Sequence, residues 1–168
     1  KNPRANTAIR LIGFWLTRST PRKLAATLLW LYQRSGLQNV LHRSGLLGHG
    51  RLARLDSLLP PVSLPLPFKG RRAQAPAPVS LFTGCTGELA DRQTLQDALR
   101  VLARLGIDAD VPTNQGCCGA LHQHNGFPAE AARLARNNLR AFTGTTPIIS
   151  SASGCGATLM EYPELLGA

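Results

Sequence analysis

Four cysteines are the residues whose type and spacing point most directly to chemistry. They are separated by intervals of 31 and 36 residues, and two of them are adjacent: Cys85, Cys117, Cys118 and Cys155. A single zinc ion needs tetrahedral ligands, which neighbouring thiolates supply poorly because their side chains diverge. A cluster of several irons accepts neighbouring thiolates on different irons. The sequence therefore favours an iron–sulfur cluster, and the alternatives are a zinc site or a purely thiol-based redox site.

Glycine stands beside each of these cysteines, within the strings 84–85, 116–119 and 154–156. Without a Cβ atom, glycine lets the backbone turn sharply and approach a bulky inorganic group closely. It also leaves N–H groups free to point at sulfur atoms, which tunes a reduction potential. Ordinary turns between strands and helices also use glycine, so the pairing of glycine with cysteine at three places is the more specific signal.

The second half of the chain alternates strand and helix patterns that would position the cysteines. The expected strands are 78–83, 107–111 and 147–151, and the expected helices are 89–105, one that begins at Pro128, and 159–166. This order predicts an α/β fold, in which a small parallel sheet with flanking helices follows the order βαβαβα. All four cysteines would follow strand ends and meet at one edge of the sheet, where open α/β sheets bind ligands.

The first half of the chain is basic and helical. Residues 1–80 hold 13 basic residues and one acid, whereas residues 81–168 hold 6 basic and 8 acidic residues. Prolines are concentrated before the first expected strand, where they oppose both helix and sheet. We therefore expect a basic helical connector over residues 1–56, a Pro-rich linker over 57–78 and a cysteine-rich domain over 79–168.

Within the connector, we expect a first helix over 5–17 and a third over 37–47. The second should begin with Thr20 as its cap and Pro21 as its first residue, and should end at Gly36. These helices are too few for a core of their own. We expect them to pack on a neighbouring domain, and the alternative is a membrane surface bound through a basic amphipathic face. No nucleic-acid recognition motif accompanies the arginines. Few contacts are expected across the linker, which would decouple the connector from the cysteine-rich domain.

Other polar side chains near the cysteines are candidates for supporting roles. His122 and His124 follow the cysteine pair closely, and His122 is the better candidate for an additional metal ligand. Glu88 and Asp91 lie where acidic side chains would favour a helix start. No Ser–His–Asp order, paired-carboxylate site or phosphate-binding loop with lysine occurs in the sequence, so hydrolase and kinase chemistry has no support.

The cysteine pattern resembles a known family. Cys85, the string Cys117-Cys118-Gly119 and Cys155, at these intervals, are similar to the cysteine-rich CCG domain of heterodisulfide reductase and of lactate-utilisation proteins. The strings around the cysteine pair (GCCGALHQH) and around the last cysteine (SASGCG) look most like the glycolate oxidase iron–sulfur subunit family. The resemblance is strongest over residues 79–166, and the basic helices resemble the connector of that family.

Two departures from the family pattern stand out. The last motif in heterodisulfide reductase is Cys-x-x-Cys, and Ala152 stands here in place of its first cysteine, so the five-cysteine set of noncubane [4Fe–4S] clusters is incomplete. The ferredoxin-type modules and the second CCG copy of the family are also not found in this sequence. We therefore expect the chain to be the middle of a longer subunit.

The resemblance implies an electron-transfer role. The parent protein would pass electrons from FAD-containing subunits, which oxidise glycolate or a similar 2-hydroxy acid, towards a quinone-type acceptor. It would be a non-catalytic [4Fe–4S] subunit of a glycolate dehydrogenase-type oxidoreductase, and this piece alone would have no activity. The alternative is a structural or zinc-binding module that docks ferredoxin modules onto flavin subunits. With no secretory signal and free thiols expected, the protein should be cytoplasmic, with peripheral binding at the inner face of the cell membrane and no nucleic-acid partner.

Overall fold

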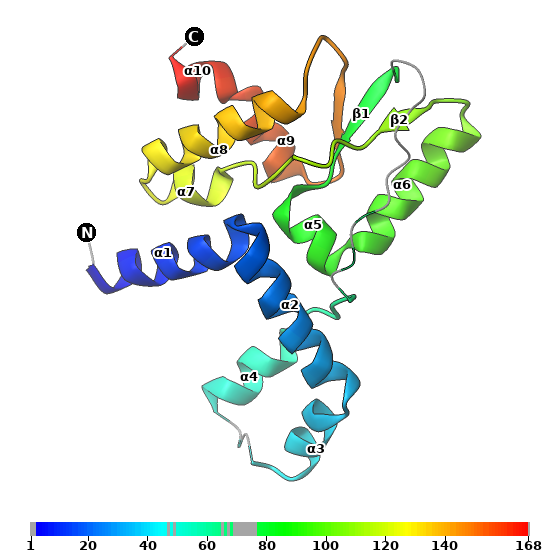
Figure 1. The fold of residues 1–168 in the computed structure, drawn as a ribbon. Helices are drawn as coiled ribbons and strands as arrows, with labels where there is room; N and C mark the ends of the chain where they lie inside the picture. Colours follow the sequence, from blue (N-terminus) through cyan, green and yellow to red (C-terminus); the bar gives the residue numbers. More distant parts are fainter. Residues whose placement is uncertain are drawn as a thin grey trace.

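The structure is a computed structural model that describes residues 3–46, 48, 50–64, 66, 68 and 77–167. Its first part holds the helices α1 (Pro3–Thr17), α2 (Ser19–Arg34), α3 (Leu37–Arg43) and α4 (Arg51–Ser57). Its second part alternates strands and helices in the order β1 (Val79–Phe82), α5 (Gly84–Ala90), α6 (Arg92–Arg104), β2 (Ala109–Asp110), α7 (Ala120–His124), α8 (Pro128–Ala141), β3 (Ile148–Ser150), α9 (Ser153–Met160) and α10 (Tyr162–Leu166) (Figure 1).

The three strands form one parallel sheet in the order β2-β1-β3. Val79 of β1 pairs with Ala109 of β2, and Leu81 pairs with Ile149 of β3. Leu81 also lies in the apolar core beside Leu95 of α6, and both side chains are fully buried. The predicted α/β class, with its small parallel sheet and flanking helices, is therefore confirmed.

Helix boundaries in the second part differ from the expected ones. The single helix expected over 89–105 is two helices, because Asp91 leaves helical geometry at φ −133° and ψ 31° between α5 and α6. The Asp91 carboxylate accepts a hydrogen bond from the Thr94 hydroxyl, and such local bonding by aspartate competes with helix continuation. The last helix is interrupted just before Pro163, where a break is expected, so that α9 and α10 meet at Glu161, although α9 begins earlier than expected, at Ser153.

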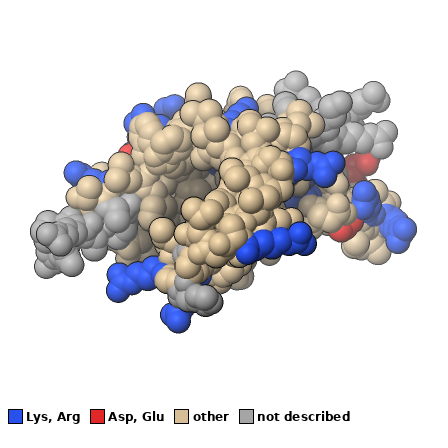
Figure 2. Space-filling model, turned by 90° about the horizontal axis from the view of Figure 1, so that it is seen from below, with Lys and Arg blue, Asp and Glu red and all other residues tan. Residues whose placement is uncertain are grey.

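The connector helices follow the expected pattern with smaller differences. The helix α2 begins at Ser19, with Arg18 as the residue before it and no side-chain cap, so the expected cap at Thr20 is wrong. The helix α3 ends at Arg43, and α4 was not expected. Most of the apolar side chains here are exposed, among them Leu11, Leu24, Leu28, Val40 and Leu55. On the face shown in Figure 2, Lys and Arg side chains are spread over the surface and Asp and Glu are few.

The connector packs directly on the cysteine-rich domain, so the expected decoupling of the two parts is wrong. The helix α1 lies along α7 and α8, while α3 and α4 extend away from the sheet (Figure 1). An ion pair joins the Arg22 guanidinium of α2 to the Glu88 carboxylate of α5 at 3.3 Å. The Arg10 guanidinium stacks over the Phe127 ring, 5.7 Å from its centroid. These contacts bridge residues on opposite sides of the linker.

Candidate metal centre

The four cysteines emerge from three strand ends and meet at one edge of the sheet, as the sequence predicts. Cys85 lies in the first turn of α5, directly after β1, and Cys155 lies in the first turn of α9, after β3. The Sγ atoms of Cys118 and Cys155 lie 3.3 Å apart. Cys117 packs against Cys85 in one buried apolar cluster. All four thiols are free, and three of them are buried.

Hydrogen bonds between the thiols lower the pKa values of two cysteines and raise those of the other two. The thiols of Cys117 and Cys155 donate to Cys118, which lowers the pKa of Cys118 to about 3 against the opposing effect of burial. Cys117 also lowers the pKa of Cys85. The same hydrogen bonds raise the pKa values of the two donors, Cys117 and Cys155. Cys118, which accepts from two thiols, is therefore the sulfur most strongly stabilised as a thiolate, and the thiolate is the form that binds soft metals.

Each thiol contacts one or two of the others, and the four thiols are not arranged around one metal position. Among the described residues, no three His, Cys, Asp or Glu side chains are arranged to hold one metal ion. Cysteine thiolates are nevertheless the ligands that iron–sulfur clusters use, and four of them converge here in a largely buried setting. The donor set therefore fits such a cluster in ligand type and in number.

Two glycines beside the cysteines are required by geometry. Gly84 has φ +66°, and a Cβ atom there would lie 3.2 Å from the Phe82 ring and 3.8 Å from the Cys155 Sγ. Gly119 has φ +98°, and its Cβ atom would lie 3.3 Å from the backbone of Ala131. Side chains at these positions would be strained and crowded. The glycines therefore allow α5 and the cysteine turn to pack closely, as the sequence pattern indicates.

A buried hydrogen-bond network holds the turn that carries Cys117 and Cys118. The Asn138 Nδ2 donates to the Cys117 carbonyl at 2.9 Å and to the Tyr162 hydroxyl at 2.8 Å, while its Oδ1 accepts from the Gly116 N–H at 2.8 Å. The Tyr162 hydroxyl donates in turn to the Cys118 carbonyl at 2.9 Å. Helices α8 and α10 thus fix the backbone on both sides of the cysteine pair. Sequence analysis did not identify these two residues.

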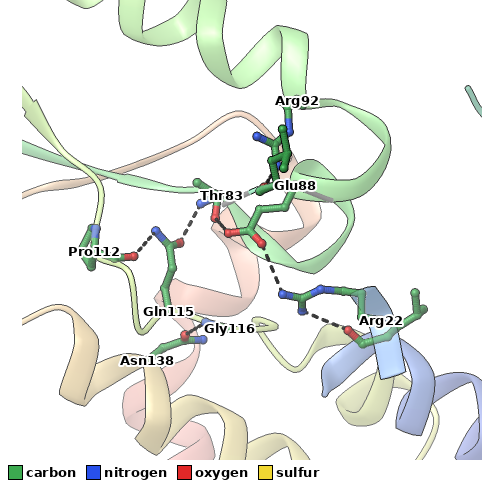
Figure 3. Close-up of polar contacts among 10 residues, drawn as sticks. Arg22, Thr83, Glu88, Arg92, Pro112, Gln115, Gly116 and Asn138 are labelled. Atoms are coloured by element: carbon green, nitrogen blue, oxygen red, sulfur yellow. Dashed lines mark hydrogen bonds and ion pairs between the residues drawn. The ribbon is translucent and has the colours of Figure 1, made fainter. Parts of the chain in front are cut away.

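A second network joins the cysteine edge to the connector (Figure 3). The Gln115 Nε2 donates to the Leu81 carbonyl of β1 at 3.1 Å, and its Oε1 accepts from the Thr83 N–H at 2.7 Å. The Thr83 hydroxyl donates to the Glu88 carboxylate at 3.1 Å, and Glu88 pairs with Arg22. Glu88 therefore links α5 to α2, beyond the helix-dipole role that its position suggested.

The structure places the His122 ring against the connector helix α1. Its ring is buried against Gly13 of α1, where an added Cβ atom would come within 2.6 Å of Nε2, and it meets the Phe127 ring edge-on. Burial lowers the pKa of His122, and its Nδ1 has no partner among the described residues. The described contacts of this ring join it to α1 and not to a cysteine. His124 is exposed on the same short helix.

Comparison with known proteins agrees with this geometry. Residues 79–160 match the model of the CCG cysteine-rich domain, and residues 7–59 match that of the linker region of the glycolate oxidase iron-sulfur subunit. The CCG domain and the preceding linker region together account for both parts of the structure. No solved structure matches the chain significantly.

Curated relatives of the CCG domain include iron–sulfur subunits. The chain is 36% identical to a probable glycolate oxidase iron-sulfur subunit of Bacillus subtilis, over 84% of this chain and 34% of the relative. It is 36% identical to the glycolate oxidase iron-sulfur subunit of Escherichia coli, over 52% of this chain and 23% of the relative. It is 31% identical to lactate utilization protein A of Bacillus pumilus, over 52% of this chain and 37% of the relative. The chain thus spans between 23% and 37% of the length of these relatives.

Proposed function

We propose that this chain is the linker region and first CCG domain of an iron–sulfur electron-transfer subunit in a complex that oxidises glycolate or a similar 2-hydroxy acid. The observation that carries the proposal is the convergence of four free thiols from three strand ends within a CCG domain. The relatives named as glycolate oxidase iron-sulfur subunits support the same role. In this role the FAD-containing subunits oxidise the hydroxy acid, and this chain does not itself catalyse that step.

The proposed ligands are Cys85, Cys117, Cys118 and Cys155. The bound group, of the [4Fe–4S] type, would supply one-electron transfer towards a quinone-type acceptor. The chain supplies thiolates whose formation is already favoured at Cys118, and it supplies burial that excludes water from the sulfurs. The network of Asn138 and Tyr162 holds the cysteine turn in place, in the manner of residues that orient metal ligands from behind.

The position in the cell belongs to the same proposal. None of the helices in the described part of the chain is both long and apolar enough to cross a membrane. We propose a cytoplasmic protein that reaches a membrane acceptor by peripheral association. The basic connector, with its exposed arginines and apolar side chains, supports this arrangement.

Metal and sulfide analysis of the full-length protein, purified without oxygen, tests the cluster. We expect iron with matching sulfide, and a paramagnetic resonance signal after reduction. Cys118→Ser should lose most of the iron and sulfide that the CCG domain contributes. Ala152→Ser is the matched control, since it places the same side chain on an exposed residue at the same sheet edge and should retain them. Zinc that is lost in Cys118→Ser, with iron and sulfide unchanged, would instead establish the alternative, a zinc-binding module that docks ferredoxin modules onto flavin subunits.

A further inference from the structure

A cleft of about 720 Å³ opens where the connector meets the CCG domain. One wall is the elbow between α1 and α2, the other wall is α8, and the floor is the loop that leads into the cysteine turn. The floor includes Gly116, next to Cys117, and the α8 wall includes Leu134, which packs on Cys85 and Cys117. The cleft therefore adjoins the cysteine edge without including any of the four thiols.

The charge in this cleft is entirely positive. Its lining holds Arg18 and Arg22 on the elbow and Arg133 and Arg140 on α8, and it contains no Asp or Glu. Two of these arginines are neutralised from outside the cleft, because Arg22 pairs with Glu88 and Arg133 pairs with Glu130. Within the part of the chain that the structure describes, no carboxylate pairs with Arg18 or Arg140. Each wall thus presents a guanidinium that is in no ion pair among these residues, although Arg18 also interacts electrostatically with Glu130 and lies 4.6 Å from the Phe14 ring centroid.

Uncharged donors lie between the two walls. Asn137 of α8 lines the cleft and bonds to the carbonyl of Asn114 on the floor, and the hydroxyls of Ser19 and Thr113 also line the cleft. Guanidinium groups with neighbouring amides and hydroxyls are the groups that proteins use to bind carboxylates and phosphates. The volume lies within the range of about 300–1,000 Å³ that is usual for small-molecule sites.

We propose that this cleft binds a small polyanion that carries at least two carboxylate or phosphate groups. One negative group would pair with Arg18 on the elbow and another with Arg140 on α8, so the ligand would bridge the connector and the CCG domain. A singly charged anion can satisfy only one wall and should bind more weakly. The proposal concerns a site separate from the cluster, and it holds whichever metal the thiols bind.

Calorimetric titration of the full-length protein with two probes, pyrophosphate and citrate, tests the site and separates phosphate from carboxylate ligands. We expect saturable binding of at least one probe, with acetate at least about tenfold weaker because it lacks a second charge. Arg140→Gln and Arg18→Gln should each weaken the binding by about fivefold or more, since each removes one charge-assisted contact. Both side chains are exposed, so these variants should fold.

Arg136→Gln is the matched control, because Arg136 is an exposed arginine of the same helix that does not line the cleft. Its binding should be unchanged. Equal weakening by Arg136→Gln and Arg140→Gln would show general charge attraction and would overturn the site, as would the absence of binding by both probes. Iron and sulfide content should stay constant in all three variants. Loss of anion binding and loss of the cluster are therefore read independently.

Discussion

Asn138 shows how much of the candidate site depends on one side chain that carries no chemistry of its own. It is only 1% exposed, and it bonds to the backbone on both sides of the step from Gly116 to Cys117 and to Tyr162. It lies four residues after the buried Leu134, on the apolar side of α8. A polar residue on an apolar helix face is the sequence signal that could have identified it.

Replacing Asn138 with alanine should destabilise the cysteine turn. The change leaves the Gly116 N–H and the Cys117 carbonyl without partners, and buried unpaired groups cost about 1–3 kcal/mol each. We expect the free energy of unfolding to fall by about 2–4 kcal/mol in urea titrations of the metal-free protein. Asn137→Ala is the control, because its hydrogen bond to the Asn114 carbonyl is at the surface and the loss should stay below about 1 kcal/mol. Equal losses for the two variants would contradict the supporting role of Asn138.

At the residue scale, the sequence was sufficient to locate the thiols but not the residues whose hydrogen bonds hold the cysteine turn. The cysteines could be placed because each follows a strand end, and parallel strands end at the same edge. Asn138 and Tyr162 could not, because they bond to backbone groups 21 and 44 residues away and no local pattern encodes such a distance. The contact of His122 with Gly13 could not be predicted for the same reason, since Gly13 lies on a helix that is distant in sequence.

Between elements, the contact of α1 with α7 depends on Gly13. An alanine at this position would favour the helix by about 1 kcal/mol, but its Cβ atom would meet the His122 ring at 2.6 Å. We expect steric conflict to dominate, so that Gly13→Ala lowers the free energy of unfolding by about 1–3 kcal/mol. In a His122→Ala background the ring is absent, and the same change should stabilise the protein by up to about 1 kcal/mol. A double-mutant cycle in urea measures both effects on the free energy of unfolding. If Gly13→Ala is destabilising with and without the His122 ring, the contact is refuted.

The three helices α2, α3 and α4 are joined by the Asp56 carboxylate. It accepts hydrogen bonds from the Tyr32 hydroxyl of α2 at 2.8 Å and from the Gln38 amide of α3 at 3.2 Å, and it also contacts the His42 ring. Burial raises the pKa of Asp56, but these hydrogen bonds outweigh it and the pKa is lowered. His42, whose side chain remains 40% exposed, is therefore part of this junction.

The Asp56 junction should weaken in acid. Because the folded-state pKa lies below the unfolded-state value, the unfolded chain takes up the proton first, and stability is lost as the pH falls below about 4. Urea unfolding of the metal-free protein can be followed by tryptophan fluorescence, since both tryptophans, Trp15 and Trp30, lie in α1 and α2. We expect a lower midpoint at about pH 3 than at about pH 6, and a smaller difference in Asp56→Asn. An identical pH dependence in both proteins would exclude Asp56 as the cause.

Element types were more predictable than element ends. The three strands occur within the expected ranges, because β-branched residues flanked by turn residues indicate a buried strand. The start of α5 at Gly84 was missed, since a glycine is a poor helix former and no local pattern indicates a helix that begins there. The short helix α4 was missed because its seven residues give less than two full periods.

On the scale of the whole molecule, the net charge of +10 is the sum of +9 in the connector, +3 in the linker and −2 in the cysteine-rich domain. We expect the full-length protein to bind vesicles that contain anionic lipid, and to release them as salt is added. Replacing four exposed connector arginines with glutamine should reduce vesicle binding at least about tenfold: Arg34, Arg43, Arg51 and Arg54. The same change at four exposed arginines of the CCG domain is the control: Arg100, Arg104, Arg136 and Arg140. Co-sedimentation measures both, and equal effects would assign the attraction to net charge alone.

The convergence of the thiols from three strand ends also determines the stage of folding at which all four come together. Cys118 and Cys155 touch although 36 residues separate them, and Cys85 joins them only after β1 has paired with β3. A nascent chain on the ribosome that has not yet released α9 therefore has no complete ligand set, whatever metal surrounds it. In the proposed function, the cluster can therefore be loaded only after the whole sheet has folded, so a loaded cluster would indicate that β3 is in place.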